Sequence, residues 1–395
     1  MILTGGEHVS VLGAVRALRE AGHAPWVAVH ERGTYVARSR ATAGTIDVPS
    51  PWDDPEAFAH EIAAATKRIG ASIILPGTEY GMVTLAERAG LFPADVILGI
   101  PPIATIAEAT DKGRLASLAR AVGLDTPPTA ELRLATLPDQ MPFDFPLVLK
   151  PHRSELPDEA GVIRHHGSQA VASVHQLRAA LSQLPGQCGL AQPFMPGPLG
   201  SLAGVSWEGR LVAAVQATAD RVWPTPCGSI SHGQTVPLDQ GLADRVGQLL
   251  GAVGWNGIFQ LDFFGAAGRH YLIDLNPRFY TSLVHATRAG MNLPAIWVDL
   301  LLGRDPVVPA SYRTGLHYRH EVGEIRGLGR MLLRGPRDEA IRGLLPRRDT
   351  AYAVFSRSDP WPVVTTLERM LRRGARGRAD RGTNPLFRGK GGVAV

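Results

Sequence analysis

The chain has 395 residues, of which 45% are hydrophobic and 19% charged, an ordinary balance for a soluble protein with two or three packed units. Its first residues are too short and too uncharged for a secretory signal, and no apolar run reaches membrane-spanning length, so we expect a cytoplasmic protein. Residues 366–395 carry eight basic and two acidic residues, an excess of six in a chain of net charge +5. The net charge of residues 1–365 is therefore about −1, and nucleic acid is not an expected partner.

Strands alternate with helices over the first hundred residues. We predict strands at 1–4, 25–30, 72–75 and 96–100, and helices from Val9 to Gly22, at 55–69 and at 79–88. This alternation is typical of a doubly wound parallel α/β sheet, which we expect to end at Pro101-Pro102. The Gly5-Gly6 turn lacks the GxGxxG spacing, so nicotinamide binding is a weak alternative.

The middle of the chain changes to an antiparallel pattern. Thr110 is the expected N-cap of a helix that ends at Gly123, and a buried strand at 145–150 ends in Lys150. We further predict helices at 171–184 and 238–253, a hairpin of 201–207 and 210–218, and a second strand pair at 258–264 and 269–276 with a turn at 265–268. From about residue 309 the chain is Arg-rich with helical stretches.

Only four of the 41 basic residues are lysines, namely Lys67, Lys112, Lys150 and Lys390. A lysine kept among arginines is a candidate for a role that needs a compact point charge. Lys112 and Lys150 lie in patterned segments, which makes them the stronger candidates. Cys188 and Cys227 form no CxxC pair and have no His at metal-binding spacing, so neither zinc nor thiol chemistry is expected.

The last predicted strand pair carries acidic residues between apolar ones. Asp274 and Asn276 are two residues apart and share a face, and Asp262 on the partner strand can reach that face. Buried carboxylates need a partner or a cation, and two carboxylates with an amide oxygen suit Mg²⁺. The alternative is that these residues end their strands and are satisfied by turns.

The motif Asp274-Leu275-Asn276-Pro277-Arg278, together with Asp262, resembles the metal-binding end of the ATP-grasp superfamily. The resemblance extends in order over roughly residues 1–305. Thr110-Asp111-Lys112 resembles its first ATP-contacting lysine motif, residues 148–151 its second, and residues 192–197 its adenine-reading hinge. This chain departs from the family pattern at three places. Pro193 stands where an acidic residue is common, and the loop from His152 to Gly161 has one glycine where the family loop is usually glycine-rich. Positions 262 and 274 are Asp where Glu is common.

The resemblance implies an α/β fold with α+β character in the grasp region. Its expected parts are an N-terminal α/β domain (1–102), grasp subdomains A (103–186) and B with the metal site (187–308), a C-terminal extension (309–365), and a basic, disordered tail (366–395). It also implies ATP and Mg²⁺ as cofactors, with Mn²⁺ as an alternative ion.

The residue roles that the resemblance implies fall into four groups: Lys112, Lys150, Gln192 and Phe194 for ATP; Asp262, Asp274 and Asn276 for the metal; Arg278, Lys150 and Arg221 for catalysis; and Glu79 and Ser229 for substrate. Arg278 is suited to the transferring phosphoryl group, with a structural ion pair as the alternative. Residues 221–231 resemble the substrate loop of carboxylate-amine ligases in this superfamily. The alternative for Arg221 is a solvent-exposed arginine without a function in the site. The alternative for Glu79 is a favourable interaction of its charge with the dipole at the N-terminus of a helix.

The implied activity is that of a carboxylate-amine ligase that forms an amide or peptide bond through an acyl phosphate. Its expected partners are small-molecule carboxylates and amines, with amino acids or peptides favoured, and a homodimer is an open alternative to a monomer. The other readings are an ATP-dependent carboxylase that uses bicarbonate, and a non-catalytic nucleotide-binding regulatory protein. His232 and His285 are candidate bases, although lone histidines are more often structural.

Overall fold

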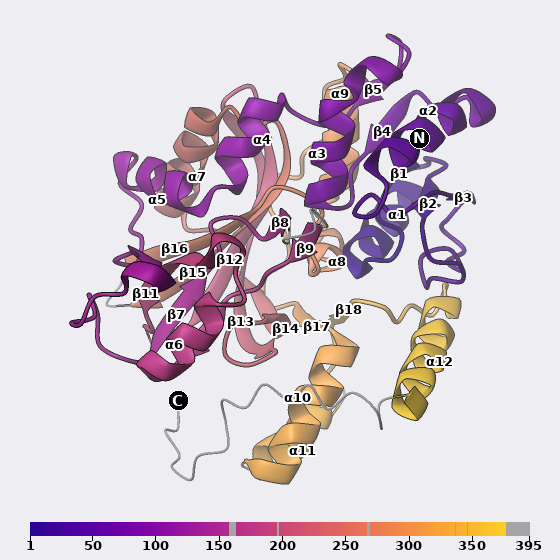
Figure 1. Cartoon of the computed structure of the whole chain (residues 1–395). Helices are drawn as coiled ribbons and strands as arrows, with labels where there is room; N and C mark the ends of the chain where they lie inside the picture. Colours follow the sequence, from indigo (N-terminus) through magenta and orange to yellow (C-terminus); the bar gives the residue numbers. More distant parts are fainter. Residues whose placement is uncertain (158–162, 196, 267–268, 336, 346, 377–395) are drawn as a thin grey trace.

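The computed structural model describes residues 1–157, 163–195, 197–266, 269–335, 337–345 and 347–376 (Figure 1). Part of the loop expected to follow Lys150 and the centre of the expected turn at 265–268 lie outside these ranges. None of the described helices is both long enough and apolar enough to cross a bilayer.

The N-terminal domain is built on a parallel sheet in the order β3-β2-β1-β4-β5. Its strands are β1 (Ile2–Leu3), β2 (Trp26–Val29), β3 (Gly44–Asp47), β4 (Ile73–Leu75) and β5 (Ile97–Leu98), and its helices are α1 (Val9–Glu20), α2 (Pro55–Ile69), α3 (Glu79–Glu87) and the 3-10 turn η1 (Ala89–Leu91). The predicted doubly wound fold is confirmed. The strand order changes direction between β1 and β4, where sheets of this type bind ligands.

The loops after β1 and β4 touch each other at this point. The backbone N–H of Gly77 donates to Thr4 Oγ1 at 3.2 Å, and a Cβ on Gly77 would come within 2.1 Å of the Thr4 carbonyl oxygen. Only glycine allows this approach, so the tight packing of the two loops fixes the start of α3 and with it the position of Glu79.

The second unit has a four-stranded sheet in the order β10-β7-β11-β6. Its elements are α4 (Ile103–Thr110), α5 (Lys112–Ala121), β6 (Ala130–Arg133), η2 (Leu134–Thr136), β7 (Leu147–Lys150), the hairpin β8 (Glu155–Pro157) and β9 (Ile163–His165), β10 (Gln169–Val171), α6 (Val174–Leu181), η3 (Pro185–Gln187) and β11 (Cys188–Pro193). Thr110 ends α4, and the expected N-cap role belongs to Asp111, whose carboxylate accepts from the N–H groups of Gly113 and Arg114. Because β11 pairs with both β6 and β7, the expected subdomain boundary at 186/187 cuts this sheet, and the sheet ends after Pro193.

A seven-stranded sheet, β16-β15-β12-β13-β14-β17-β18, forms the centre of the molecule. Its strands are β12 (Leu199–Trp207), β13 (Arg210–Trp223), β14 (Ser229–Val236), β15 (Gly257–Ala266), β16 (Arg269–Asn276), β17 (His317–Arg319) and β18 (Thr350–Tyr352). The helices of this part are α7 (Gln240–Val253), α8 (Leu283–Arg288), α9 (Leu293–Leu301), α10 (Glu321–Arg334), α11 (Arg337–Leu344) and α12 (Trp361–Arg376). The expected C-terminal extension therefore also supplies two strands to this sheet.

Apolar faces join the units. Helix α7 begins at the N-cap Asp239, ends at the left-handed Gly254, and buries one face together with α4 and α5 against the large sheet. Helix α1 packs on α8 and α9, so that one core runs from the N-terminal sheet to β12 and β13. The parallel sheet and the large sheet are thus held in one packed body.

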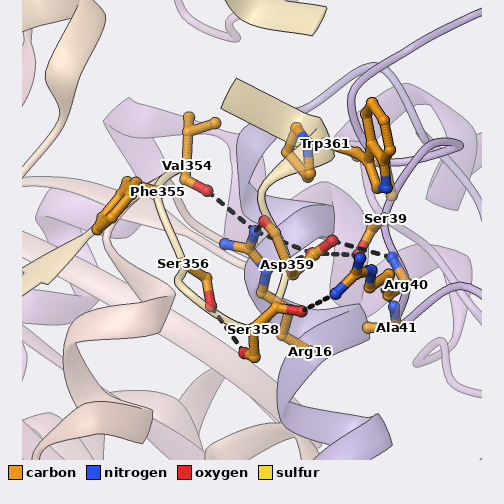
Figure 2. A network of polar contacts seen from close by, with 12 residues as sticks. Arg16, Ser39, Arg40, Ala41, Val354, Phe355, Ser356, Ser358, Asp359 and Trp361 are labelled. Atoms are coloured by element: carbon orange, nitrogen blue, oxygen red, sulfur yellow. Dashed lines mark hydrogen bonds and ion pairs between the residues drawn. The ribbon is translucent and has the colours of Figure 1, made fainter. Parts of the chain in front are cut away.

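The C-terminal segment returns to the N-terminal domain, where α12 lies beside it in Figure 1. Buried Asp359 accepts hydrogen bonds from Arg16, from the Ser39 hydroxyl at 2.6 Å and from the Arg40 backbone N–H at 2.9 Å (Figure 2). The expected disordered tail from 366 is corrected here, because α12 continues through that boundary to Arg376; residues 377–395 lie outside the described residues.

Candidate functional site

Two of the four lysines meet the acidic strand β16. Lys112, at the start of α5, places its Nζ 2.9 Å from Asp274 Oδ1 and 3.2 Å from Ser154 Oγ. Lys150 is buried at the end of β7, and its Nζ donates to the Ile273 carbonyl oxygen at 2.9 Å. Burial, opposed in part by Asp274, lowers the pKa of Lys150 to about 8. Lys112 lies 162 positions before Asp274, and Lys150 lies 123 positions before Ile273. Folding thus joins distant segments of the chain into one charged cluster.

Asp262, Asp274 and Asn276 are brought together by strand register. Asp262 lies opposite Asp274 and Gln260 opposite Asn276 in the antiparallel pair β15–β16, and Asn276 Nδ2 donates to Asp262 Oδ2 at 3.1 Å. Burial and the charge of Asp274 raise the pKa of Asp262 to about 7. Burial also disfavours the charge on Asp274, but Lys112 and Lys150 hold its pKa below the usual range.

This donor set fits a divalent cation. Asp262 has no cationic side chain within hydrogen-bonding distance in the described structure, and Asn276, Arg278 and Lys150 offset only part of the effect of burial and of the second carboxylate. Two carboxylates and an amide oxygen on adjacent strands are the hard oxygen ligands that Mg²⁺ and Mn²⁺ prefer, with space left for phosphate oxygens and water. Asp262, Asp274 and Asn276 are therefore the residues that would hold the expected metal.

An elongated cavity leads from this cluster to β11. It is bounded by Val148, Gln192, Phe194, Leu199 and Phe264. Gln192 is buried and its Nε2 donates to Thr129 Oγ1 at 2.9 Å, while the Phe194 backbone N–H donates to the Pro146 carbonyl oxygen. The side-chain amide of Gln192 is thus fixed by a protein partner, and the apolar walls suit a flat aromatic ring. Contacts of Gln192 and Phe194 with adenine remain a prediction.

A second cavity, of about 450 Å³, also borders the metal residues. Arg278 and Ser229 line it. In the described part of the chain the Arg278 guanidinium hydrogen-bonds to the Phe279 carbonyl oxygen at 3.0 Å and to Asn276 Oδ1 at 3.4 Å, and forms no ion pair. An arginine held in place but without a carboxylate partner can receive an anion. This geometry disfavours the structural-ion-pair alternative.

Arg221 differs from its expected place. Strand β13 continues to Trp223, so Arg221 belongs to the sheet, and only 224–228 connects β13 to β14. Its guanidinium forks onto Glu324 of α10, with an Nε–Oε1 distance of 3.1 Å and an Nη2–Oε2 distance of 2.5 Å, and the Ser231 hydroxyl donates to the same carboxylate. The side chain of Glu324 is 3% exposed. Arg221 thus neutralises a buried carboxylate and lines neither of the cavities described above, and its catalytic role stays a prediction.

Four titratable side chains gather where the N-terminal switch point faces Arg278. Burial and Arg278 lower the pKa of His8 to about 4. Burial raises the pKa of Glu79, although Arg278 and Lys112 oppose it. Burial and Glu79 raise the pKa of Glu155 to about 7, and one Glu155 carboxylate oxygen is buried with no hydrogen-bond partner. Burial and Arg278 also lower the pKa of His165.

One segment of the chain matches a known protein family. Residues 188–323 match a family model described as ATP-grasp in the biosynthetic pathway with Ter operon. This match covers about a third of the chain and includes the strand pair that carries the acidic motif. A comparison with curated protein sequences found no match.

Solved structures share the ATP-grasp fold at low sequence identity. An L-amino acid ligase from Bacillus licheniformis superposes with a TM-score of 0.57 and 16% identity, covering 76% of this chain and 73% of that one. A biotin carboxylase from Campylobacter jejuni superposes with a TM-score of 0.60 and 14% identity, covering 80% of this chain and 74% of that one. N5-carboxyaminoimidazole ribonucleotide synthetase from Thermus thermophilus superposes with a TM-score of 0.57 and 17% identity, covering 79% of this chain and 81% of that one. These similarities establish the fold.

The two candidate histidine bases have structural partners. His232 is buried with its Nδ1 2.8 Å from Asp220 Oδ2, and His285 Nε2 lies 2.7 Å from the Leu316 carbonyl oxygen. Sequence reasoning did not select His8, Glu155 or His165. Their positions give a signal only after folding, because His8 follows β1 and Glu155 begins β8 in the loop region after Lys150.

Proposed function

We propose that this chain is an ATP-dependent carboxylate-amine ligase of the ATP-grasp type that forms an amide bond through an acyl phosphate. One observation carries the ATP-dependent step: Lys112 and Lys150 flank Asp274, which lies opposite Asp262 in a buried strand pair. Two cations beside two buried carboxylates provide charges for a triphosphate and for a divalent ion at one place. Bound there, Mg²⁺ would neutralise phosphate oxygens during phosphoryl transfer.

The residues then have separate tasks. Lys112 and Lys150 bind phosphate oxygens, and Arg278 holds the carboxylate substrate and the transferring phosphoryl group in the second cavity, which it lines. A carboxylate oxygen attacks the γ-phosphorus, the bond between that phosphorus and the bridging oxygen breaks, and ADP leaves. The planar guanidinium suits this position because it pairs with two oxygens at once.

Glu79 and Glu155 are proposed to receive the amine. Glu79 begins α3 beside the switch point and Glu155 begins β8, and both interact electrostatically with Arg278; a pair of half-buried carboxylates favours an ammonium group. The ammonium group first loses one proton to solvent. The unpartnered oxygen of Glu155 can then accept a second proton as the nitrogen attacks the acyl carbon and the carbon–oxygen bond to phosphate breaks. A carboxyl group with a pKa of about 7 is suited to this task near neutral pH.

Hydroxylamine trapping tests the acyl phosphate directly. The purified chain is incubated with Mg-ATP, hydroxylamine and single carboxylates from an amino-acid and organic-acid panel, and both ADP and the hydroxamate are measured. We expect equal amounts of both products with the correct carboxylate. Arg278→Met should lower the rate roughly 10²- to 10³-fold, whereas the exposed Arg288→Met should not. ATP that binds without any hydroxamate across the panel would refute the ligase proposal.

Bicarbonate is the carboxylate of the second candidate function. The 2-oxoglutarate carboxylase domain from Hydrogenobacter thermophilus, solved with MgADP and bicarbonate, shares this fold with a TM-score of 0.57 at 15% identity. A carboxylase would release ADP with bicarbonate and no amine. The same ADP assay separates the two, because the ligase should stay silent with bicarbonate and respond to an organic carboxylate.

A further inference from the structure

Three side chains with metal-binding atoms meet on one face of the four-stranded sheet, apart from the acidic residues of β15 and β16. They are Glu131 of β6, His152 just after β7, and Cys188 at the start of β11. Cys188 Sγ lies 3.3 Å from Glu131 Oε1 and 3.8 Å from His152 Nε2, and His152 Nε2 lies 3.7 Å from Glu131 Oε2. All three side chains therefore point to one small volume.

These separations match the edges of a tetrahedral metal site. With metal–sulfur bonds of about 2.3 Å and metal–nitrogen or metal–oxygen bonds of about 2.0 Å, tetrahedral angles place neighbouring ligand atoms roughly 3.3–3.6 Å apart. The distances of His152 Nε2 from Cys188 Sγ (3.8 Å) and from Glu131 Oε2 (3.7 Å) need only small side-chain movements. Cys188 Sγ contacts the other oxygen, Glu131 Oε1, at 3.3 Å, so the carboxylate turns slightly for Oε2 to complete the set. A thiolate, an imidazole and a carboxylate are also the mixed ligand set that Zn²⁺ accepts and Mg²⁺ does not.

Strand register explains why the cluster forms. In β11, Leu190 lies opposite both Lys150 of β7 and Glu131 of β6, so the three share a face. Cys188 is two residues from Leu190, and His152 is two residues from Lys150, which returns both to that face. Cys188 and His152 are thus one row further along the sheet than Lys150, and Glu131 reaches them from the row of Lys150.

The surroundings leave room for an ion. The side chain of Glu131 is 43% exposed and that of His152 is 34% exposed, so an ion and a water molecule can reach the site. Arg133 lies 2.6 Å from Glu131 Oε1, which leaves Oε2 facing His152. The Lys112 backbone N–H donates to the His152 carbonyl oxygen at 3.0 Å, so the cluster contacts the segment that carries the first lysine.

We propose that Glu131, His152 and Cys188 bind one Zn²⁺, with water as the fourth ligand. The ion would tie β6, β11 and the segment after β7 together beside the nucleotide site. The binding reaction releases the thiol proton of Cys188 to solvent and involves no change of oxidation state. This site is independent of the ligase activity, since it can bind zinc whether or not the chain forms amide bonds.

Cobalt substitution tests the site without an activity assay. Tag-free full-length protein is stripped of metal, placed in excess Mg²⁺ to occupy the Asp262–Asp274 site, and titrated with Co²⁺ and then Zn²⁺. We expect one equivalent of Co²⁺ to produce a thiolate-to-cobalt charge-transfer band, and one equivalent of Zn²⁺ to abolish it. Zn²⁺ should also raise the thermal midpoint of the protein, because it binds the folded state.

Matched variants decide which residues bind. Cys188→Ser should lose the band, and His152→Gln should lower Zn²⁺ affinity by more than the roughly 10- to 100-fold that loss of an outer hydrogen-bond partner costs. Cys227→Ser and the exposed His175→Gln should keep both the band and the affinity. The proposal is overturned if wild-type protein gives no band, if Cys188→Ser keeps it, or if Cys227→Ser removes it. Circular dichroism of each variant verifies the fold.

Discussion

Asp359 should be one of the largest single contributors to the stability of the chain. Its side chain is 6% exposed, and it accepts hydrogen bonds from the Arg16 guanidinium at 3.0 Å, the Ser39 hydroxyl at 2.6 Å and the Arg40 backbone N–H at 2.9 Å (Figure 2). Asp359→Ala leaves the Arg16 cation, 12% exposed, without its carboxylate. Removing one member of a buried ion pair costs about 3–5 kcal/mol, and we expect a loss of that size.

Urea titration followed by tryptophan fluorescence measures this loss, and Trp361 lies next to the network (Figure 2). The control is Asp47→Ala, which breaks an ion pair with Arg32 whose side chains are 62% and 90% exposed, and should change stability by less than about 1 kcal/mol. Adding Arg16→Met to Asp359→Ala should restore part of the loss, since no unpaired cation remains. A loss below about 1 kcal/mol in Asp359→Ala would refute the reasoning.

Three further outcomes are expected. Asp274→Asn should lower ATP turnover at least roughly 10²-fold with an unchanged circular dichroism spectrum, and retained turnover would contradict the metal assignment. Arg221→Met should lower the free energy of unfolding by about 3–5 kcal/mol, because Glu324 stays buried without its cation. The double variant with Glu324→Met should recover most of this loss. Unchanged stability with lost turnover would instead support the catalytic role of Arg221. Burial lowers the pKa of His285 to about 4 from the ordinary 6.5, so the unfolded chain binds a proton between those values that the folded chain does not. Stability should therefore be full above pH 6.5 and fall by roughly 3 kcal/mol towards pH 4, and urea titrations of His285→Gln should lack this part of the slope.

The sequence predicted those parts of the fold whose signals are local. The alternating apolar runs before Pro101 predicted the parallel sheet, and the two-residue spacing of Asp274 and Asn276 predicted a shared strand face. The order of Lys112, Lys150, Gln192 and the acidic motif predicted the grasp arrangement. Each of these signals rests on periodicity or on the order of motifs along the chain.

Contacts between distant strands could not be predicted in this way. Arg221 was placed in a substrate loop because its partner Glu324 lies 103 residues further along. The cluster of Cys188 with His152 was excluded for lack of local metal-binding spacing, since their contact depends on the register of β7 against β11. Glu155 lacks any sequence pattern, and only its burial beside Glu79 and Arg278 makes it notable.

The pairing of β17 with β14 has a consequence for the chain as it leaves the ribosome. His232 and Gln234 lie opposite Arg319 and His317, so the outer edge of β14 has no strand partner until more than 80 residues after it have been synthesised. An uncovered edge strand is a template for pairing with another chain. Nascent or prematurely terminated chains that end before residue 317 should therefore be prone to aggregation, and a chaperone that covers strand edges would be needed mainly during this interval.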